Sequence, residues 1–494
     1  MPTALSSSTL PDLADKAKVP CYDRSRLSPG IVHFGVGNFH RAHMAIYLDT
    51  LFNKGLALDW AIVGAGTRPT DLAMRERLAA QDFLTTVAEQ GNDSTSLRVT
   101  GSMVDFLDPS HPDQIVARLA DPSIRIVSLT VTEGGYNIDP GSGRFNPADP
   151  EVVRDVANFD APVSVFGMIV KALDLRRSAD LKPFTVMSCD NIPSNGEVTR
   201  ATILGIAAMV SAQLHDWLQD NLACPNGMVD RITPATGDRE RAQMRETYGI
   251  DDGSPVFCEG FKQWVLEDHF SAGRPPLEEA GVTLVEDVAP FELMKIRILN
   301  GGHAAIAYPA ALLDMEFVHQ AMGDELILKY FRRLQKQEIV PLVPPVPDTD
   351  INAYVDKISE RFGNARMADT NRRVCFDGSN RQPKYVLPTV LDALRQGRPV
   401  EGLALISAFW CRYCAGETES GARIESNDPN WERMRETALA ARDDPSIFLS
   451  MTDIFGEVAT YSAYVDAFSA ALSSIWMHGT RETLLRYAEA GEAV

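Results

Sequence analysis

The chain has 494 residues, of which 45% are hydrophobic and 23% are charged. These values are typical of an ordinary globular protein with two or more domains. The net charge of −20 disfavours nucleic acid or an anionic membrane surface as a partner, because both need a basic patch.

Cysteine usage and the distribution of apolar residues predict the compartment. The seven cysteines are spread thinly over the chain, which suits a reducing compartment better than a disulfide framework. Residues 1–19 contain no long apolar core behind a basic end, and no apolar run of about 18 residues follows. The sequence therefore predicts a cytoplasmic protein that does not enter a membrane.

The first strong strand pattern, in residues 31–34, runs into a turn with two glycines, and a helical apolar pattern follows over 42–54. Strand, glycine turn and helix in this order are the context in which a dinucleotide pyrophosphate lies on a helix N-terminus. The pair of glycines alone is a weak signal, and His40 stands where the motif usually has a third small residue. Its place at the head of a series of strands favours a cofactor site at Gly35, Gly37, Asn38 and Phe39.

Strand and helix patterns then alternate, which predicts an α/β fold with a parallel, Rossmann-type sheet over residues 1–284. Strands are expected at 60–63, 85–88, 97–100, 124–132 and 184–188, and helices at 71–80, 113–119, 163–176 and 197–213. Functional residues of such a sheet collect at the carboxyl ends of its strands. Two of these ends are polar, with Thr132 and Glu133 after one strand and Asn191 after another.

The residue expected to contact the adenosine ribose is unusual. NAD enzymes commonly carry Asp or Glu after the second strand, whereas this chain has Arg68 at about that place. An arginine could instead contact a 2′-phosphate, so the residues themselves leave NAD and NADP open.

Long helical patterns replace the alternation from about residue 285. They cover 292–313, 317–339, 351–362, 389–396, 402–414, 431–441 and 458–494. A segment with four prolines, 341–347, is most simply a stiff connector. We expect a mainly α-helical C-terminal domain over 285–494 that binds the substrate and carries the catalytic residues.

The first of these helices carries a polar face within an apolar setting. At about 100° per residue, Glu292, Asn300 and His303 share one side with Lys295. A lysine and a histidine on a half-polar helix are usually solvated, but the flanking apolar runs and Gly301-Gly302 indicate a cleft and a close approach. Burial would lower the pKa of Lys295 toward neutrality, which makes it a candidate general base.

Other patterns are weaker. His40 and His43 lack further ligands nearby for a metal site, and Cys411-x-x-Cys414 lies within an apolar helical run, so core cysteines are favoured. No nucleophile elbow and no P-loop are present. Asp230, Arg373 and Arg381 form a scattered polar set in which each residue alone is more simply a turn or ion-pair residue.

Several stretches together resemble the long-chain polyol dehydrogenases, the mannitol 2-dehydrogenase family. They are residues 31–43, Thr132-Glu-Gly-Gly-Tyr136, Met187-Ser-Cys-Asp-Asn191, Met228-Val-Asp-Arg-Ile-Thr-Pro234, and Lys295 followed by Asn300 and His303. The likeness runs in order from about residue 30 to beyond 410. It implies a Rossmann-type domain for a nicotinamide cofactor, a helical domain that closes over it, and no zinc.

The resemblance also implies residue roles. Lys295 would be the general acid/base, and Asn191 and Asn300 would donate hydrogen bonds to the alkoxide. His303, Asp230 and Arg373 would hold substrate hydroxyls, and Glu292 would gate a water route to Lys295. Many relatives carry Lys where Arg381 stands and Ser where Gly302 stands, which leaves the far end of the substrate pocket and the exact sugar open.

The sequence thus predicts an NAD-dependent enzyme, with NADP as an alternative cofactor, that interconverts D-mannitol and D-fructose. A fructuronate or tagaturonate reductase and a D-arabinitol dehydrogenase remain alternatives within the same chemistry. A catalytically silent nucleotide-binding protein is the alternative from another class, although it would not need Lys295, Asn191 and Asn300. A monomer is favoured, with a small homo-oligomer as the alternative.

Overall fold

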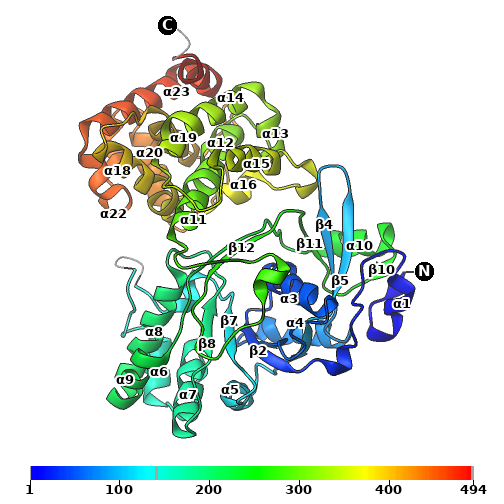
Figure 1. Cartoon of the computed structure of the whole chain (residues 1–494). Coiled ribbons are helices and arrows are strands. Elements are labelled where there is room, and N and C mark those ends of the chain that lie inside the picture. Colours follow the sequence, from blue (N-terminus) through cyan, green and yellow to red (C-terminus); the bar gives the residue numbers. More distant parts are fainter. Residues whose placement is uncertain (1, 140–142, 491–494) are drawn as a thin grey trace. The chain divides into compact units, whose positions relative to one another are not determined.

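The computed structural model describes residues 2–139 and 143–490 (Figure 1). Its internal contacts divide the chain into two compact units, Met1–Ala289 and Pro290–Val494. The first unit contains the sheets, and helices dominate the second. The expected α/β N-terminal part and mainly helical C-terminal part are therefore confirmed.

A parallel sheet with the strand order β6-β3-β2-β7-β8 forms the centre of the first unit. Its strands are β2 (Pro29–Phe34), β3 (Ala61–Ala65), β6 (Met103–Phe106), β7 (Ile126–Leu129) and β8 (Thr185–Ser188). The chain leaves β2 for β3 on one side and later crosses to β7 on the other. The carboxyl ends of β2 and β7 therefore form a topological switch point, the place where open α/β sheets bind ligands.

Successive side chains of each strand point to opposite faces of this sheet, and both faces are buried. In β2, Val32 belongs to a core shared with α5, α7 and α8, whereas Ile31 belongs to a second core shared with α3. The sheet is thus covered by helices on both sides, as a doubly wound fold requires. These helices are α3 (Met44–Asn53), α5 (Pro112–Ala120), α7 (Val165–Ser178) and α8 (Asn195–Val210).

The strands expected at 85–88 and 97–100 exist but do not join the parallel sheet. β4 (Thr85–Gln90) and β5 (Thr95–Thr100) pair in antiparallel fashion, and β11 (Val256–Glu259) lies beside β4. The amide of Gly91 donates to the carbonyl of Ser94 at 2.9 Å, which closes a short hairpin turn. The prediction was wrong because so short a connection cannot cross to a parallel neighbour, which takes a dozen or more residues.

Shorter elements complete the first unit. β9 (Gly227–Asp230), β12 (Gln263–Glu267) and β13 (Thr283–Val285) form a further sheet, and β1 (Thr3–Ala4) pairs with β10 (Ile250–Asp251). The remaining α-helices are α1 (Leu10–Leu13), α2 (Asn38–Ala42), α4 (Pro69–Ala79), α6 (Pro150–Ala157), α9 (Ala212–Asn221) and α10 (Asp238–Thr247). The sequence patterns did not predict β6, β9 or β11 to β13, which are short and partly polar.

The second unit is organised around α19 (Glu401–Cys414), in which every residue after Glu401 is buried. Contacts join α19 to α12 (Gly301–Leu312), α20 (Trp431–Ala440) and α23 (Ser462–Glu489), and α23 also packs on α14 (Glu325–Leu334). The cysteines of the Cys411-x-x-Cys414 pattern lie in this core as free thiols. Further helices are α11 (Ala289–Met294), α13 (Val318–Gly323), α15 (Ile351–Phe362), α16 (Asn371–Val374), α17 (Gly378–Arg381), α18 (Leu387–Arg395), α21 (Ser446–Leu449) and α22 (Thr452–Phe455).

The long helices predicted in this unit are interrupted. Residues 317–339 form α13 and α14, separated at Asp324, whose carboxylate caps α14 by accepting the amides of Leu326 and Ile327. Gly479, at φ +82°, kinks α23. The helical run also widens into π-helix at η5 (Lys295–Asn300), η6 (Gln335–Ile339) and η9 (Gln382–Val386). Within the described part of the chain, no helix has both the length and the apolar character to cross a membrane.

Candidate functional site

The glycine turn after β2 uses its two glycines differently. Gly35 has φ +90°, and a Cβ added there would lie 2.1 Å from the carbonyl oxygen of Thr130 on β7's side of the switch point, so the backbone admits only glycine. Gly37 caps α2, and a Cβ added to it would meet nothing nearer than 3.8 Å. The space over Gly37 is therefore open, as a turn that receives a pyrophosphate needs.

His40 fills the third position of this turn with an aromatic ring. It is 1% exposed, and its ring stacks on that of His33 with centroids 3.5 Å apart. His33 is fixed by Ser128 Oγ at 2.8 Å and Thr130 Oγ1 at 2.9 Å. Burial lowers the pKa of both histidines, to about 3 for His33. The close packing that a third glycine normally allows is thus replaced by a stack of two neutral imidazoles.

Metal binding finds no support in the side chains around the turn. His43 is also buried, and its Nε2 lies 2.9 Å from the carbonyl oxygen of Gln263. Among residues 2–139 and 143–490, no three or more His, Cys, Asp or Glu side chains gather where they could hold a metal ion.

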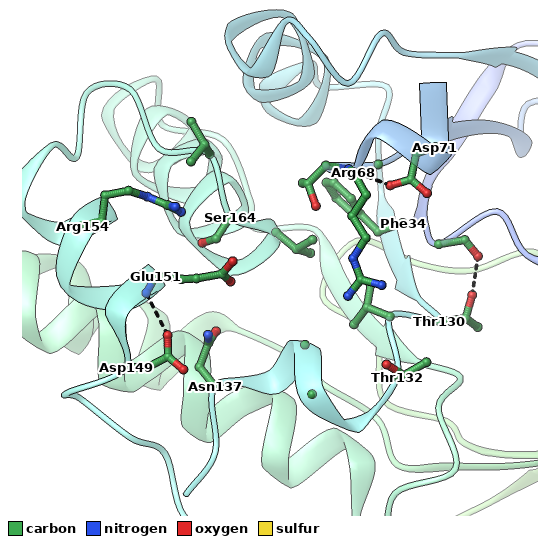
Figure 2. Close-up of a pocket in the computed structure, with 18 residues that line it drawn as sticks. Phe34, Arg68, Asp71, Thr130, Thr132, Asn137, Asp149, Glu151, Arg154 and Ser164 are labelled. Atoms are coloured by element: carbon green, nitrogen blue, oxygen red, sulfur yellow. Dashed lines mark hydrogen bonds between the residues drawn. The ribbon is translucent and has the colours of Figure 1, made fainter. Parts of the chain in front are cut away.

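A pocket of about 400 Å³ opens beside the glycine turn in the first unit (Figure 2). Gly35, Arg68 and Thr132 line one part of it, and Glu151 and Arg154 of α6 line the other. Figure 2 shows Arg68 and Glu151 projecting into the pocket from opposite sides. Its volume is in the range of pockets that hold small ligands and cofactors.

The acidic residue of the loop after β3 is engaged with the backbone. The carboxylate of Asp71 accepts the amides of Thr67 at 3.0 Å and Arg68 at 2.9 Å, and thereby caps α4. Arg68 is left as the side chain of this loop that extends into the pocket. The sequence singled out Arg68 in this loop, but it did not single out Glu151, whose helix start carries only capping signals.

The strand-end residues expected in the site come together at β7 and β8. These strands are neighbours, and Leu129 pairs with Ser188, so Thr132 and Glu133 leave the sheet beside the segment that contains Asn191. The carboxylate of Asp190 accepts the amides of Val131 and Thr132, each at 2.9 Å. Asp230 ends β9, where it pairs with Gln263 of β12, and it is 5% exposed.

In the second unit, α11, η5 and α12 follow one another without a break, and the π-helical turn changes the expected side-chain register. The amide of Gly301 donates to the carbonyl of Ile296, five residues earlier. A constant advance of about 100° per residue is therefore wrong here. Residues five apart lie one turn apart on the same side of a π-helix, so Lys295 and Asn300 are aligned. Lys295 is buried, with 7% of its surface exposed.

The glycines after η5 permit close packing within the second unit. A Cβ added to Gly302 would lie 2.9 Å from Gln335 Nε2 and 2.9 Å from a ring carbon of Phe331. Gln335 donates from Nε2 to the carbonyl of Ile298 at 2.9 Å, so η6 holds the backbone of η5 directly. The close approach expected at Gly301-Gly302 is therefore an approach of neighbouring protein groups.

His303 lies among the arginines that the sequence singled out. Its ring stacks on Phe362 with centroids 3.9 Å apart, and Nε2 is buried without a hydrogen-bond partner in the described structure. The pKa of His303 is lowered to about 3, mainly by burial, with Asp369 opposing the shift and Arg373, Arg361 and Arg381 adding to it. His303 is thus a neutral imidazole at physiological pH, suited to a hydrogen bond with a hydroxyl.

Arg373 and Arg381 are both held by protein groups. Arg373 makes a bidentate ion pair with Asp369, with Nε to Oδ1 at 2.5 Å and Nη2 to Oδ2 at 2.6 Å. Arg381 donates to the carbonyl of Val374 at 2.8 Å. The positive charge of Arg373 is therefore largely balanced before any substrate arrives.

Comparison with known proteins identifies the family. The family model of the mannitol dehydrogenase Rossmann domain matches residues 29–279, and that of the mannitol dehydrogenase C-terminal domain matches residues 287–476. The chain belongs to the mannitol dehydrogenase family. Membership of a dehydrogenase family makes it an oxidoreductase, and it confirms both the resemblance read from the motifs and the Rossmann type of the first unit.

Relatives of the mannitol dehydrogenase family match over nearly their whole length. Mannitol 2-dehydrogenase of Cereibacter sphaeroides is 52% identical over 95% of this chain and 98% of its own. Among solved structures, the ternary complex of Pseudomonas fluorescens mannitol 2-dehydrogenase with NAD and D-mannitol has a TM-score of 0.89 and 42% identity, covering 98% of this chain and 99% of its own. A substrate-free D-sorbitol dehydrogenase has a TM-score of 0.89 and 34% identity, covering 98% and 100%.

Proposed function

We propose that this chain is a zinc-independent, NAD-dependent mannitol 2-dehydrogenase that interconverts D-mannitol and D-fructose. The observation that carries the proposal is the likeness, over 98% of the chain, to a solved mannitol 2-dehydrogenase complex with NAD and D-mannitol. The residues of both units supply groups of the kind that this chemistry needs. A cytoplasmic location and a monomeric state complete the proposal.

The first unit would bind the cofactor, whose bound nicotinamide supplies the hydride acceptor. Gly37 leaves the space over the turn open, and the adjoining pocket is lined by Arg68, Thr132 and Glu151. Gly35, Asn38, Phe39 and Glu133 would complete the cofactor contacts. The side chain of Asn38 is fixed by protein groups, because its amide donates to Pro234 O at 3.0 Å and to Thr236 Oγ1 at 2.9 Å and its Oδ1 accepts from Arg41 at 2.7 Å.

Lys295 would act as the general base in the oxidation of the polyol and as the general acid in the reverse direction. In its neutral form it takes the proton of the C2 hydroxyl while negative charge develops on that oxygen. Asn300 lies on the same side of η5 and would donate a hydrogen bond to this oxygen, as would Asn191 from the first unit. Preorganised donors of this kind contribute about 3–4 kcal/mol each to stabilising the transition state, in place of a metal. Glu292, one turn before Lys295, would gate the exchange of its proton with water.

His303, Asp230, Arg373 and Arg381 would position the other hydroxyls of the sugar. The neutral ring of His303 and the charge-balanced pair of Arg373 with Asp369 suit hydroxyls better than a carboxylate. A uronate would need an unbalanced cation to compensate for its carboxylate in a buried site. The ion pair therefore favours a polyol over fructuronate or tagaturonate as the substrate.

A spectrophotometric assay and an analysis of the product test the proposal. Oxidation of NADH and of NADPH is followed with D-fructose, D-fructuronate, D-tagaturonate and D-xylulose, and the sugar alcohol formed from fructose is identified by chromatography. Reduction of fructose at C2 gives either D-mannitol or D-sorbitol, so the product reports the face that receives the hydride. We expect mannitol, with NADH preferred. Sorbitol as the product would indicate the activity named for the second structural relative, and no turnover with any sugar would leave a silent nucleotide-binding protein.

The oligomeric state is tested separately by light scattering coupled to size-exclusion chromatography. A monomer is expected to elute with a mass near the 54.2 kDa of the chain.

A further inference from the structure

Asp190 is a buried carboxylate that lies directly before Asn191 and is engaged by three donors. It is 8% exposed. Its Oδ1 accepts the amide of Thr132 at 2.9 Å, and its Oδ2 accepts the amide of Val131 at 2.9 Å and the hydroxyl of Tyr136 at 2.7 Å. One side chain from the end of β8 therefore holds the whole start of the segment that follows β7.

The segment held in this way has a costly backbone conformation. Thr132 has φ +65° and ψ 166°, a region that glycine reaches readily and that other residues adopt only when their surroundings impose it. The amide of Thr132, which precedes its strained torsions, and the amide of Val131 before it are both bonded to Asp190. The carboxylate is thus placed to hold the backbone from which Thr132 lines the pocket.

A directional chain of hydroxyls completes the contacts of Asp190. Ser188 accepts the amide of Asp190 at 3.2 Å, and its Oγ lies 2.5 Å from the hydroxyl of Tyr136. Because the hydroxyl of Tyr136 donates to Asp190, Ser188 must donate to Tyr136. The ring of Tyr136 packs on Phe166 at 5.4 Å between centroids, so its hydroxyl is fixed by the core.

The same network reaches β9. Asn195 donates from Nδ2 to the carbonyl of Asp190 at 3.0 Å and to that of Gly227 at 2.8 Å, and its Oδ1 accepts the amide of Gly227 at 2.9 Å. Gly227 opens the strand that ends at Asp230. Asp190 therefore links the segments that carry Thr132, Asn191 and Asp230, all within the first unit.

We propose that Asp190, supported by Tyr136, is a positioning residue that sets Asn191 and the Thr132–Glu133 segment relative to each other for hydride transfer. The proposal rests on the proposed function, because it assigns Asn191 to the developing oxyanion and Thr132 to the cofactor. Asp190 itself contacts neither substrate nor cofactor. Its effect on turnover comes from the alignment of the groups that do.

The test compares Asp190→Asn with a matched control. In Asp190→Asn, one carboxylate oxygen is replaced by an NH₂ group, which cannot accept a hydrogen bond from the donors that face it. Asp252 is a suitable control because it is 2% exposed and likewise accepts two amides, of Thr86 and Ser254 at 2.7 Å each, and one side-chain donor, Gln81 at 2.8 Å. Each variant is purified as the full chain, and its melting temperature, NADH dissociation constant and kcat with fructose are measured.

We expect both Asp→Asn variants to melt at lower temperature, and only Asp190→Asn to lose activity per folded molecule. Its kcat should fall roughly 100-fold and its NADH dissociation constant should rise roughly 5-fold, since misplacement of reacting groups by about 1 Å costs that much. Asp252→Asn should keep kcat within about twofold of the wild type. Tyr136→Phe keeps the ring and removes one hydrogen-bond donor to Asp190, and its kcat should fall roughly 10-fold. This variant provides a second test if Asp190→Asn does not fold.

A further variant tests the backbone part of the proposal. Gly adopts the torsions of residue 132 without strain, so Asp190→Asn should lower the melting temperature less in a Thr132→Gly background than in the wild type. Equal losses in both backgrounds would contradict a restraint on Thr132.

The outcomes separate the positioning role from the proposed function. Equal kcat for Asp190→Asn and wild type, or equal losses for Asp190→Asn and Asp252→Asn, would overturn the positioning role while the enzyme assay stands. If the wild type turns over no sugar, the proposed function fails, and the NADH dissociation constant then decides: an unchanged value in Asp190→Asn overturns the positioning role as well.

Discussion

Mild acid should destabilise the first unit through the buried histidines of its glycine turn. The pKa values of His33 and His43 are lowered by burial from 6.5 to about 3. A group with a lowered pKa takes up protons more readily in the unfolded chain, so the stability that it contributes is complete above pH 6.5 and is lost as the pH falls toward 3. Acidification therefore favours the unfolded state in this window.

The loss of stability at low pH follows from the difference between the pKa of each histidine in the unfolded chain and its pKa in the folded protein. One pKa unit corresponds to about 1.4 kcal/mol, so each of these two histidines costs about 2 kcal/mol at pH 5 and about 4 kcal/mol at pH 3. Together they remove about 4 kcal/mol at pH 5, a large part of the 5–15 kcal/mol by which proteins are typically stable. The buried carboxyls of Asp49 and Asp190, whose pKa values burial raises, act in the opposite sense.

His40→Phe tests a third buried histidine, which stacks on His33. Both ring nitrogens of His40 are buried without a partner in the described structure, and burial lowers its pKa well below 6.5. Phenylalanine keeps a flat ring against His33 and cannot take up a proton. Melting temperatures by circular dichroism should agree within a few degrees at pH 7.5, whereas the variant should melt higher than the wild type at pH 5. A variant that gains nothing over the wild type at pH 5 would refute the buried, neutral state of His40.

Further substitutions test the site groups. Lys295→Ala should lower kcat by about 10²- to 10⁴-fold and leave the NADH dissociation constant nearly unchanged, as measured by fluorescence titration; equal loss of both would contradict its role as the acid/base. Asn300→Ala should lower kcat by about 10²- to 10³-fold with little change in the KM for fructose. Arg68→Glu should lower kcat/KM for NADPH relative to NADH by about tenfold, since it would oppose a 2′-phosphate. Asp369→Asn leaves the charge of Arg373 unbalanced, so the ratio of fructuronate to fructose reduction should rise about tenfold; an unchanged ratio would show that the ion pair does not select against carboxylates.

The parts of the fold with strong periodic patterns could be predicted from the sequence. Strand β2, its glycine turn and α15 were found because apolar spacing and glycine act locally. Pairing partners could not be read in the same way. β4 and β5 have ordinary strand patterns, and only the short turn between them shows that they form a hairpin outside the main sheet. Short strands such as β9 and β12 offer too few residues for a period to be recognised.

Some residues of the candidate site could also be predicted from the sequence, and others could not. Motif spacing pointed to Lys295, Asn300 and His303, which share one continuous helical run, and to Asn191 at a strand end. Motif spacing could not predict contacts between distant segments of the chain. The ion pair of Asp369 with Arg373 spans only four residues and is of a kind that local spacing can indicate, whereas no local pattern indicates that Glu151 faces Arg68 across a pocket. Asp190 stood next to a predicted site residue, but its bonding partners Val131 and Thr132 lie 59 and 58 residues before it in the chain.

The π-helical turn η5 shows what a regular helical wheel misses. At about 100° per residue, Asn300 would stand about 140° from Lys295, at the far edge of the shared polar side. One wide turn brings the two into line, and His303 follows Asn300 by three residues on the same face. Such turns are energetically poor, so they persist where neighbours hold them. Here η6 does so through Gln335, which donates to the carbonyl of Ile298 inside the turn. The side chain that supports the unusual backbone lies some forty residues from Lys295, so the alignment of the proposed base and amide is a property of tertiary packing.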